Sequence, residues 1–433
     1  MAGQMMTPDR GILSRSRLHG AVPEYKLGVS SMNTWALCAL WVGLALFATL
    51  LAIWLHISTA LSEIVVGTVA QLVLAACFAR GGLLASTEWI AFLAGTGAIV
   101  LTFLAGAELD PSIFRSKWRE VLIIGLAGFF GPFLGCTLVA HFLLHWTIMA
   151  SWLCGVALST TSVAVVYAVM LELGFNTTEY GKAILAACFV NDLGTVLALG
   201  LIFSPFSIKT LILVGVCAAA FAALPKLTPW FFRKYGGRVS ELEAKTLLFI
   251  LFALGGLALW AGSEPVLPAY LIGMVLAGTV GKDHSLIRRL RTLTFGFLTP
   301  FYFIRAGSFV SVPVLIAAPL TLLILFLAKM ASKITFVFPA VQFHRYKGAA
   351  GVYYTLMMST GLTFGTISAL FGLNHKIISQ AQYSFLVGTV IASAVIPTLI
   401  ANSFFLPRHL LPLIPEGDPE KKALQEPVEP DVI

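Results

Sequence analysis

The chain has 433 residues, of which 58% are hydrophobic and only 11% are charged. A soluble domain carries about 25% charged residues, so this composition excludes a soluble globular protein. The formal net charge of +8 does not indicate nucleic-acid binding, because membrane proteins collect Lys and Arg in their cytoplasmic loops.

Apolar runs of about 20 residues recur from residue 34 to residue 406, and each is long enough to cross a hydrocarbon layer about 30 Å thick. In lipid only helices and closed barrels satisfy their own backbone polar groups, and these runs are too long and too uniformly apolar for barrel strands. The sequence therefore predicts an all-α polytopic membrane protein. We expect thirteen transmembrane helices at about 34–56, 61–81, 88–107, 119–143, 148–171, 182–204, 207–227, 245–262, 266–281, 293–311, 312–338, 348–371 and 380–406.

Positive charge is distributed unevenly between the two faces that thirteen spans define. Most basic residues of the short loops, among them Arg115, Arg233 and Arg289, lie on the face that carries the C-terminus. This asymmetry predicts that the N-terminus lies outside and the C-terminus in the cytoplasm. The basic N-terminal tail, residues 1–33, does not fit this pattern, and the Pro- and Glu-rich tail, residues 407–433, is predicted to be disordered.

Cysteine and histidine residues show no spacing that is typical of a metal site or a disulfide framework. All six cysteines fall in apolar spans, and the eight histidines fall in loops, tails or span ends. No phosphate-binding or dinucleotide-binding glycine motif is present. We therefore expect no cofactor and no enzymatic activity.

Two short segments resemble each other across the chain. The fifth helix contains ALSTTSVAVV (157–166), and the twelfth contains MMSTGLTFG (357–365), which align with an offset of 200 residues. This offset maps helices four to six onto helices eleven to thirteen, and the odd number of spans between them inverts their direction. The pattern predicts an inverted-topology repeat with ion sites at broken helices near the midplane.

Ser, Thr and Gly in the middle of these two spans weaken the helix and free hydroxyl and carbonyl oxygens, which are hard ligands for an alkali cation. Small residues also suit close helix packing, so both interpretations stay open. The candidate ligands in the fifth helix are Ser159, Thr160 and Thr161, and those in the twelfth are Thr360 and Gly361.

Asp192 lies at the middle of the sixth helix, in CFVNDLGTVLALG. A centred Asp costs about 3 kcal/mol to insert, so it normally lines a cavity and has a function. A proton and a metal cation can compete for its single carboxylate, which is sufficient for antiport. A structural Asp that hydrogen-bonds a neighbouring helix is the alternative. Asn191 faces about 100° away and can supply a carbonyl ligand or hydrogen-bond another helix.

Basic residues also occur inside predicted spans. Lys329 is mid-span in the eleventh helix, and it needs a carboxylate, a helix C-terminus or a water-filled cavity. Lys333 is closer to the cytoplasmic end, where its side chain can snorkel to the interface. Arg305, in the tenth helix, can pair with Glu63 or Glu108 or reach the interface; both glutamates lie at span ends, where we expect them to be hydrated.

Several segments together resemble the monovalent cation:proton antiporter superfamily, in particular its bacterial sodium/proton exchangers and Kef-type carriers. They are FLAGAELDP, ALSTTSVAVV, LELGFNTTEYGKAILAACFVNDLGTVLAL, LPAYLIGMVLAG and TPFYFIRAG, and the resemblance covers nearly all of residues 60–406. The resemblance implies a homodimer in which a six-helix core moves against a scaffold in elevator fashion. The implied division is an N-terminal tail (1–33), scaffold helices (34–112), core helices (113–204), a linker and scaffold helices (205–311), core helices (312–406) and a cytoplasmic tail (407–433).

The resemblance also implies roles for individual residues. The acidic pair of the family matches Asn191 and Asp192, its core basic residue matches Lys329, and its unwound crossing helices match Thr160-Thr161 and Thr360-Gly361. Relatives with an Asn-Asp pair exchange one cation for one proton, so we expect electroneutral exchange of Na⁺ or K⁺. Many of those relatives also carry an acidic residue in the fifth helix, which this chain lacks.

Two other functions remain open from the sequence. A sodium-coupled organic-solute symporter of the same fold would need a roomy polar cavity and little use for Lys329. A cation channel would need a continuous pore, which an inverted repeat and a centred Asp192 do not favour.

Overall fold

The computed structural model describes residues 33–55, 57–77, 87–107, 116–203, 207–237, 240–263, 265–281 and 283–411. Throughout these residues the regular structure is helical. The main helices are α1 (Thr34–Leu55), α2 (Thr59–Cys77), α3 (Glu88–Ala107), α5 (Trp118–Leu138), α6 (Ile148–Ser159), α7 (Val163–Glu172), α8 (Glu179–Phe203), α9 (Ile208–Tyr235), α10 (Leu242–Trp260), α11 (Val266–Leu276), α12 (His284–Leu293), α13 (Thr299–Ser308), α14 (Val312–Ala317), α15 (Pro319–Phe343), α16 (Gly348–Met358), α17 (Thr363–Asn374) and α18 (Gln380–Phe404).

The helices lie at all thirteen predicted positions. Within the described residues, ten helical segments are long and apolar enough to cross a membrane. The remaining three predicted spans are the broken pair α6 and α7, the short helix α11, and a continuous run of α12, the π-helical turn η4 (Thr294–Leu298) and α13. The all-α polytopic fold is therefore confirmed, although all of the N-terminal tail except Asn33 lies outside the described residues, as does the C-terminal tail beyond residue 411.

The two largest errors in the predicted helix boundaries are at ends that carry charge. The tenth span starts at His284 rather than near residue 293, because the arginine-rich α12 is amphipathic and buries Leu286, Ile287 and Leu290. The seventh span runs on past residue 227 to Tyr235, since α9 continues through its internal prolines. Charged residues hid both extensions from a search for uniformly apolar runs.

Two of the spans are interrupted at the positions that the repeat predicts. α6 ends at Ser159, and Thr160 adopts an extended conformation before α7 begins at Val163. α16 ends at Met358, and α17 begins at Thr363. Each interruption leaves backbone groups without helical partners in the middle of a span, which lipid does not tolerate unless protein or a ligand satisfies them.

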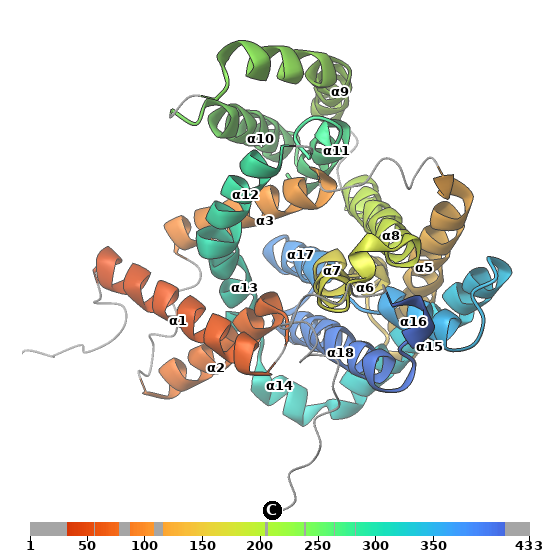
Figure 1. Ribbon diagram of the computed structural model, residues 1–433. Helices are drawn as coiled ribbons and strands as arrows, with labels where there is room; N and C mark the ends of the chain where they lie inside the picture. The colour runs from red at the N-terminus through yellow and green to blue at the C-terminus, as the bar shows by residue number, and fades with distance from the viewer. Residues whose placement is uncertain are drawn as a thin grey trace, which may run out of the picture.

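Figure 1 shows the helices in two groups. We call α5 to α8 together with α15 to α18 the central bundle, and α1 to α3 together with α9 to α13 the outer bundle. α14 lies at the edge where the two groups join (Figure 1). The two halves of the repeat, α5 to α8 and α15 to α18, thus come together although they are far apart in the sequence.

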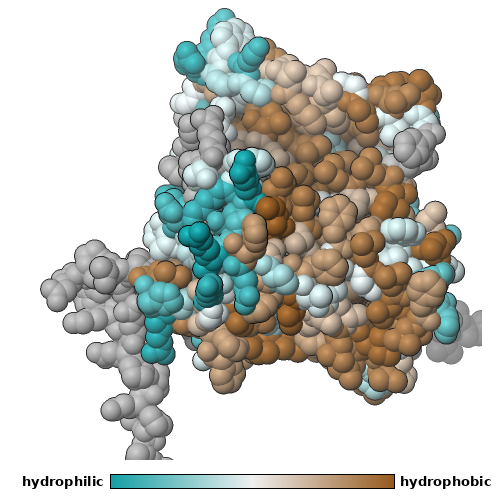
Figure 2. Space-filling model, turned by 90° about the vertical axis from the view of Figure 1, so that its right-hand side faces the viewer, coloured by the Kyte–Doolittle hydropathy of each residue, from teal (hydrophilic) through white to brown (hydrophobic). Residues whose placement is uncertain are grey.

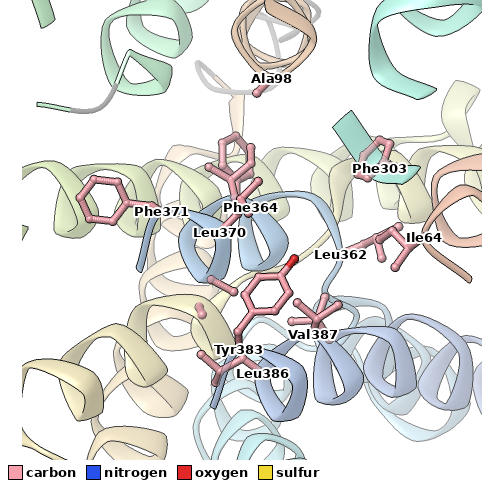
Figure 3. Packing of buried hydrophobic residues seen from close by; sticks show 14 of the residues in the cluster. Ile64, Ala98, Phe303, Leu362, Phe364, Leu370, Phe371, Tyr383, Leu386 and Val387 are labelled. Carbon is pink, nitrogen blue, oxygen red and sulfur yellow. The ribbon is translucent and has the colours of Figure 1, made fainter. Parts of the chain in front are cut away.

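Apolar side chains join the two bundles in the interior (Figure 3). Ile64 of the outer bundle lies beside Leu362 and Val387 of the central bundle, and Ala98 and Phe303 belong to the same buried cluster. Such contacts have little directional preference, in contrast with hydrogen-bonded contacts.

The surface of the molecule fits a lipid environment. Figure 2 shows hydrophobic residues over most of the face formed by the right-hand helices of Figure 1, with hydrophilic residues gathered along one edge. The exposed large hydrophobic residues of α5 and α15 include Leu122, Ile123, Phe130, Leu134, Leu138, Leu320, Leu323, Leu327, Ile334 and Phe336. An apolar surface of this extent marks contact with a membrane rather than with water.

Candidate functional site

Asp192 lies in the middle of α8 and is only 1% exposed. Its carboxyl group faces the backbone amides of Thr161 and Val163, at the N-terminus of α7. Free amides and the dipole of a helix N-terminus favour a negative charge. The Oδ1 atom of Asp192 has no hydrogen-bond partner in the described part of the chain, so the carboxyl group retains a binding position.

The interrupted segments of the two repeats cross beside this carboxyl group. The Ser162 amide donates a 3.2 Å hydrogen bond to the Thr360 carbonyl, and the Thr161 hydroxyl donates a 2.9 Å bond to the Met358 carbonyl. At Gly361 a Cβ atom would collide with Lys329 Nζ and would lie 3.0 Å from Thr160 Oγ1. Glycine at this position therefore allows the two interrupted segments to approach each other.

Asn191 is fully buried, and neither Nδ2 nor Oδ1 of its amide has a partner in the described residues. The amide lies near Gly128 of α5, where an added Cβ would be 3.1 Å from Nδ2. Leaving a buried polar group unsatisfied costs about 1–3 kcal/mol. Such groups are rare in native proteins, and one beside an unpartnered carboxylate oxygen indicates a position for a ligand or water.

Hydroxyl groups surround the same position. Ser159 Oγ and Thr195 Oγ1 are 3.3 Å apart. The Thr195 hydroxyl also donates a 3.3 Å hydrogen bond to the backbone carbonyl of Asn191. The Thr160 hydroxyl donates to the Ala157 carbonyl at 3.2 Å. Thr195 was not among the predicted site residues, although its position one helical turn after Asn191 was a signal that could have found it.

Two lysines of α15 are fully buried beside the crossing. Lys329 Nζ donates a 2.9 Å hydrogen bond to Ser393 Oγ of α18, and Lys333 Nζ donates a 2.9 Å bond to Thr161 Oγ1. Both ammonium groups act electrostatically on the Asp192 carboxyl group, and Lys333 has the stronger influence. The prediction that Lys333 can snorkel to the interface was wrong, because α15 continues to Phe343 and holds this residue in the interior.

Arg305 is not part of this group. It lies on the wall of a separate cavity of about 620 Å³ between α3, α10 and α13 of the outer bundle and α17 of the central bundle. Its guanidinium group lies 5.0 Å from the centre of the Phe309 ring. Glu63, expected to be hydrated, is instead 1% exposed with an unpartnered Oε1 atom in the described structure, whereas Glu108 lies outside the described residues.

The donor set of the site is rich in oxygen. Within the described ranges there is no group of three or more His, Cys, Asp or Glu residues that could hold a metal ion. One carboxylate, amide and hydroxyl oxygens and free carbonyls suit a hard, weakly held cation better than a transition metal. The single carboxyl group limits the negative charge of the site to one.

The sequence matches the family described as sodium/hydrogen exchanger, transmembrane, over residues 42–405. A probable Na⁺/H⁺ antiporter 3 from Methanocaldococcus jannaschii is 26% identical over 336 residues, which cover 74% of this chain and 84% of that protein. The glutathione-regulated potassium-efflux system protein KefC of Salmonella arizonae is 26% identical over 277 residues, which cover 58% of this chain and 42% of that protein.

A solved structure shares the fold. It is that of the sodium proton antiporter MjNhaP1 from Methanocaldococcus jannaschii at pH 8, with a TM-score of 0.64 and 15% sequence identity. The likeness covers 85% of this chain and 96% of that one. The likeness shows that the two chains share the same overall fold.

Proposed function

This chain belongs to the sodium/hydrogen exchanger family of cation/proton antiporters, and we propose that it exchanges one Na⁺ or K⁺ ion for one proton at Asp192. The observation that carries this proposal is the unpartnered carboxylate oxygen of Asp192, buried at mid-span beside the unpartnered amide of Asn191. Both lie where the two interrupted helices cross. A buried carboxylate with an unsatisfied oxygen atom can take up a neutralising ion, which lowers the cost of crossing the membrane interior.

Competition for one carboxyl group couples the two ions. When the carboxyl group holds a proton, it cannot bind a cation, and when it is ionised, it can. The Asn191 carbonyl, the hydroxyls of Ser159, Thr160 and Thr161, and carbonyls released by the broken helices would complete the oxygen shell. Na⁺ and K⁺ both accept such ligands.

Asn191 determines the expected stoichiometry. An amide does not ionise, so only one carboxyl group of the site changes its charge during the cycle. If Lys329 and Lys333 keep the same charge in both orientations, one positive charge crosses in each direction. The exchange is therefore electroneutral.

Two features support a relative movement of the bundles, with the central bundle as the moving core and the outer bundle as the scaffold. The cavity of about 620 Å³ separates them near the end of α17. Elsewhere the bundles touch through apolar side chains, which have little directional preference, and through contacts such as that of Arg291 of α12, whose Cζ atom lies 5.9 Å from the centre of the Tyr167 ring of α7. Movement of the central bundle against the outer bundle would open the site first to one compartment and then to the other, so that Asp192 is accessible from each in turn.

The remaining proposals concern the setting of the transporter. The distribution of basic loop residues supports an N-terminus outside and a C-terminus in the cytoplasm of a bacterial inner membrane. Two copies would assemble through their outer bundles, since α9 buries little of its apolar surface within one chain.

Purified protein in vesicles that contain a pH-sensitive dye tests the function. An outward proton movement driven by added Na⁺ or K⁺, with no current on a solid-supported membrane, is the expected result. Repeating the assay with Na⁺, K⁺ and Li⁺ across a pH series identifies the cation. Sodium uptake that requires an organic solute would instead establish symport, and an ohmic current would establish a channel.

A further inference from the structure

Two sulfur atoms lie together one helical turn from Asp192. Cys188 of α8 donates its thiol hydrogen to the thioether sulfur of Met358, the last residue of α16, at a distance of 3.5 Å. Both side chains are fully buried. Residues four positions apart share a helix face, so the thiol and the Asp192 carboxyl group lie on the same side of α8.

The sulfur pair borders the unpartnered amide of Asn191. A Cβ atom added at Gly128 would lie 3.2 Å from Cε of Met358 and 3.1 Å from Nδ2 of Asn191. The amide has no hydrogen-bond partner in the described residues. The charged groups that face the Cys188 sulfur are Asp192 and Lys333. The proposed position for an alkali cation, a hard ion, is thus bordered by two sulfur atoms, which are soft donors.

From this arrangement we propose that Cys188 and Met358 form a binding site for a soft monovalent metal ion, Ag⁺ or Cu⁺, which blocks the transport site. Thiolate and thioether ligands select such ions over alkali cations. Two sulfur ligands are sufficient for them, so the lack of a larger metal-binding group among the described residues is no obstacle.

The binding step needs no oxidant. The Cys188 thiol releases its proton to water, its sulfur forms a bond to the metal ion, and the Met358 sulfur donates an electron pair to the same ion. The thiolate and the ion together are neutral, which limits the cost of burial. Met358 has three rotatable side-chain bonds, so its sulfur can move to the opposite side of the ion.

Blocking follows from position. A metal ion between α8 and α16 would join both repeats of the central bundle beside Asn191 and Asp192, and it would displace the alkali cation. Water must carry the metal ion to the buried thiol, and this part of the inference rests on the proposed function, because the same route serves the transported cation.

Vesicles prepared in nitrate buffer, which avoids silver chloride, allow the test. We expect Ag⁺ to inhibit exchange by the unmodified protein, with inhibition expressed relative to the uninhibited rate of each variant. In Cys188→Ser the inhibitory concentration should rise at least about tenfold, which corresponds to about 1.4 kcal/mol. Met358→Leu keeps the volume but removes one ligand, so its inhibitory concentration should lie between the two.

Cys217→Ser is the matched control. Cys217 is also a buried thiol, and it lies on α9 of the outer bundle. Its loss should leave silver sensitivity unchanged. Equal sensitivity of Cys188→Ser and the unmodified protein would overturn the proposal, and so would equal sensitivity of Met358→Leu.

A second measurement does not depend on transport. In a variant that keeps Cys188 and has serine at the other five cysteines, native mass spectrometry should detect one silver ion per chain. Replacing Cys188 as well should abolish that adduct. If no exchange were observed at all, the proposed function would fail, whereas an adduct that persists without Cys188 would refute the sulfur site.

Discussion

Lys333 donates a 2.9 Å hydrogen bond to the Thr161 hydroxyl, across 172 positions of sequence. The bond joins the middle of α15 to the interruption between α6 and α7, and it places a buried ammonium group beside the candidate cation site. The Thr161 hydroxyl in turn donates to the Met358 carbonyl. One side chain thus connects both halves of the repeat at the point where a cation would bind.

Replacing Lys333 by Met should strengthen cation binding. Two positive charges in a partly hydrated site repel each other by about 1 kcal/mol or more, and an apolar side chain of similar length fills the same space. We expect the cation concentration for half-maximal exchange to fall several-fold, together with a lower melting temperature, because removing one partner of a buried charge pair is destabilising.

Lys209→Met provides the control for this prediction. Lys209 is an exposed residue of α9, 5.2 Å from the centre of the Trp260 ring, and α9 belongs to the outer bundle (Figure 1). Its replacement should leave the half-maximal concentration unchanged. An unchanged or higher value in Lys333→Met would show that the ammonium group does not oppose the cation.

Gly361→Ala should impair transport more than folding. The added methyl group collides with Lys329 Nζ and displaces it from Ser393, while the nearby Thr160 hydroxyl, at 3.0 Å, loses space. Overpacking of this kind costs about 1–3 kcal/mol. We expect at least a tenfold loss of exchange, about 1.4 kcal/mol in the barrier, with a modest fall in melting temperature.

Gly215→Ala is the control for Gly361→Ala, because a Cβ atom at Gly215 meets nothing within 4 Å. This change in α9 should preserve both exchange and melting temperature. Wild-type exchange by Gly361→Ala would mean that the crossing has room for a side chain, which contradicts the described geometry.

Asp283 lies outside the membrane, directly before the tenth span, and caps the N-terminus of the amphipathic helix α12. The amide of Leu286, followed by the Ser285 hydroxyl and amide, lowers the pKa of the Asp283 carboxyl group. A lowered folded-state pKa stabilises the fold above the unfolded pKa of about 3.9, and this contribution disappears as the pH falls through the folded value. Asp283→Ala should cost about 0.5–2 kcal/mol near neutral pH.

Thermal unfolding in detergent at pH 7 and at pH 3 measures this cap. The difference between the unmodified protein and Asp283→Ala should shrink at the lower pH, and Asp283→Asn should resemble the unmodified protein at pH 7, since Asn is also a good cap. A difference that is the same at both pH values would rule out the ionised carboxyl group as its source.

The sequence alone was sufficient to predict the crossing of the two repeats. Thr160 and Thr360 follow from a short self-match, and the centred Asp192 follows from the cost of a charge in lipid. These signals are local in the sequence, or depend on a single spacing. They can therefore be recognised without knowing how the helices pack.

Other parts of the site depend on helix rotation and neighbours, which the sequence does not contain. Ser393 looks like many other hydroxyl residues in apolar helices, and only its position beside Lys329 singles it out. Arg305 lies in the last turn of α13, and its side chain lines the cavity wall rather than the crossing. Glu63 is near a helix end in sequence, yet neighbouring helices bury it.

Asp192→Asn in vesicles is the most direct test of the central claim, that one mid-membrane carboxyl group binds the proton and the cation in turn. Asparagine keeps the shape of the side chain but can neither ionise nor carry a proton between compartments. With Asp283→Asn as a control for loss of a carboxyl group elsewhere, we expect cation-driven proton movement to fall to the level of protein-free vesicles in Asp192→Asn alone, with an unchanged elution profile. Exchange that persists in Asp192→Asn would contradict the account.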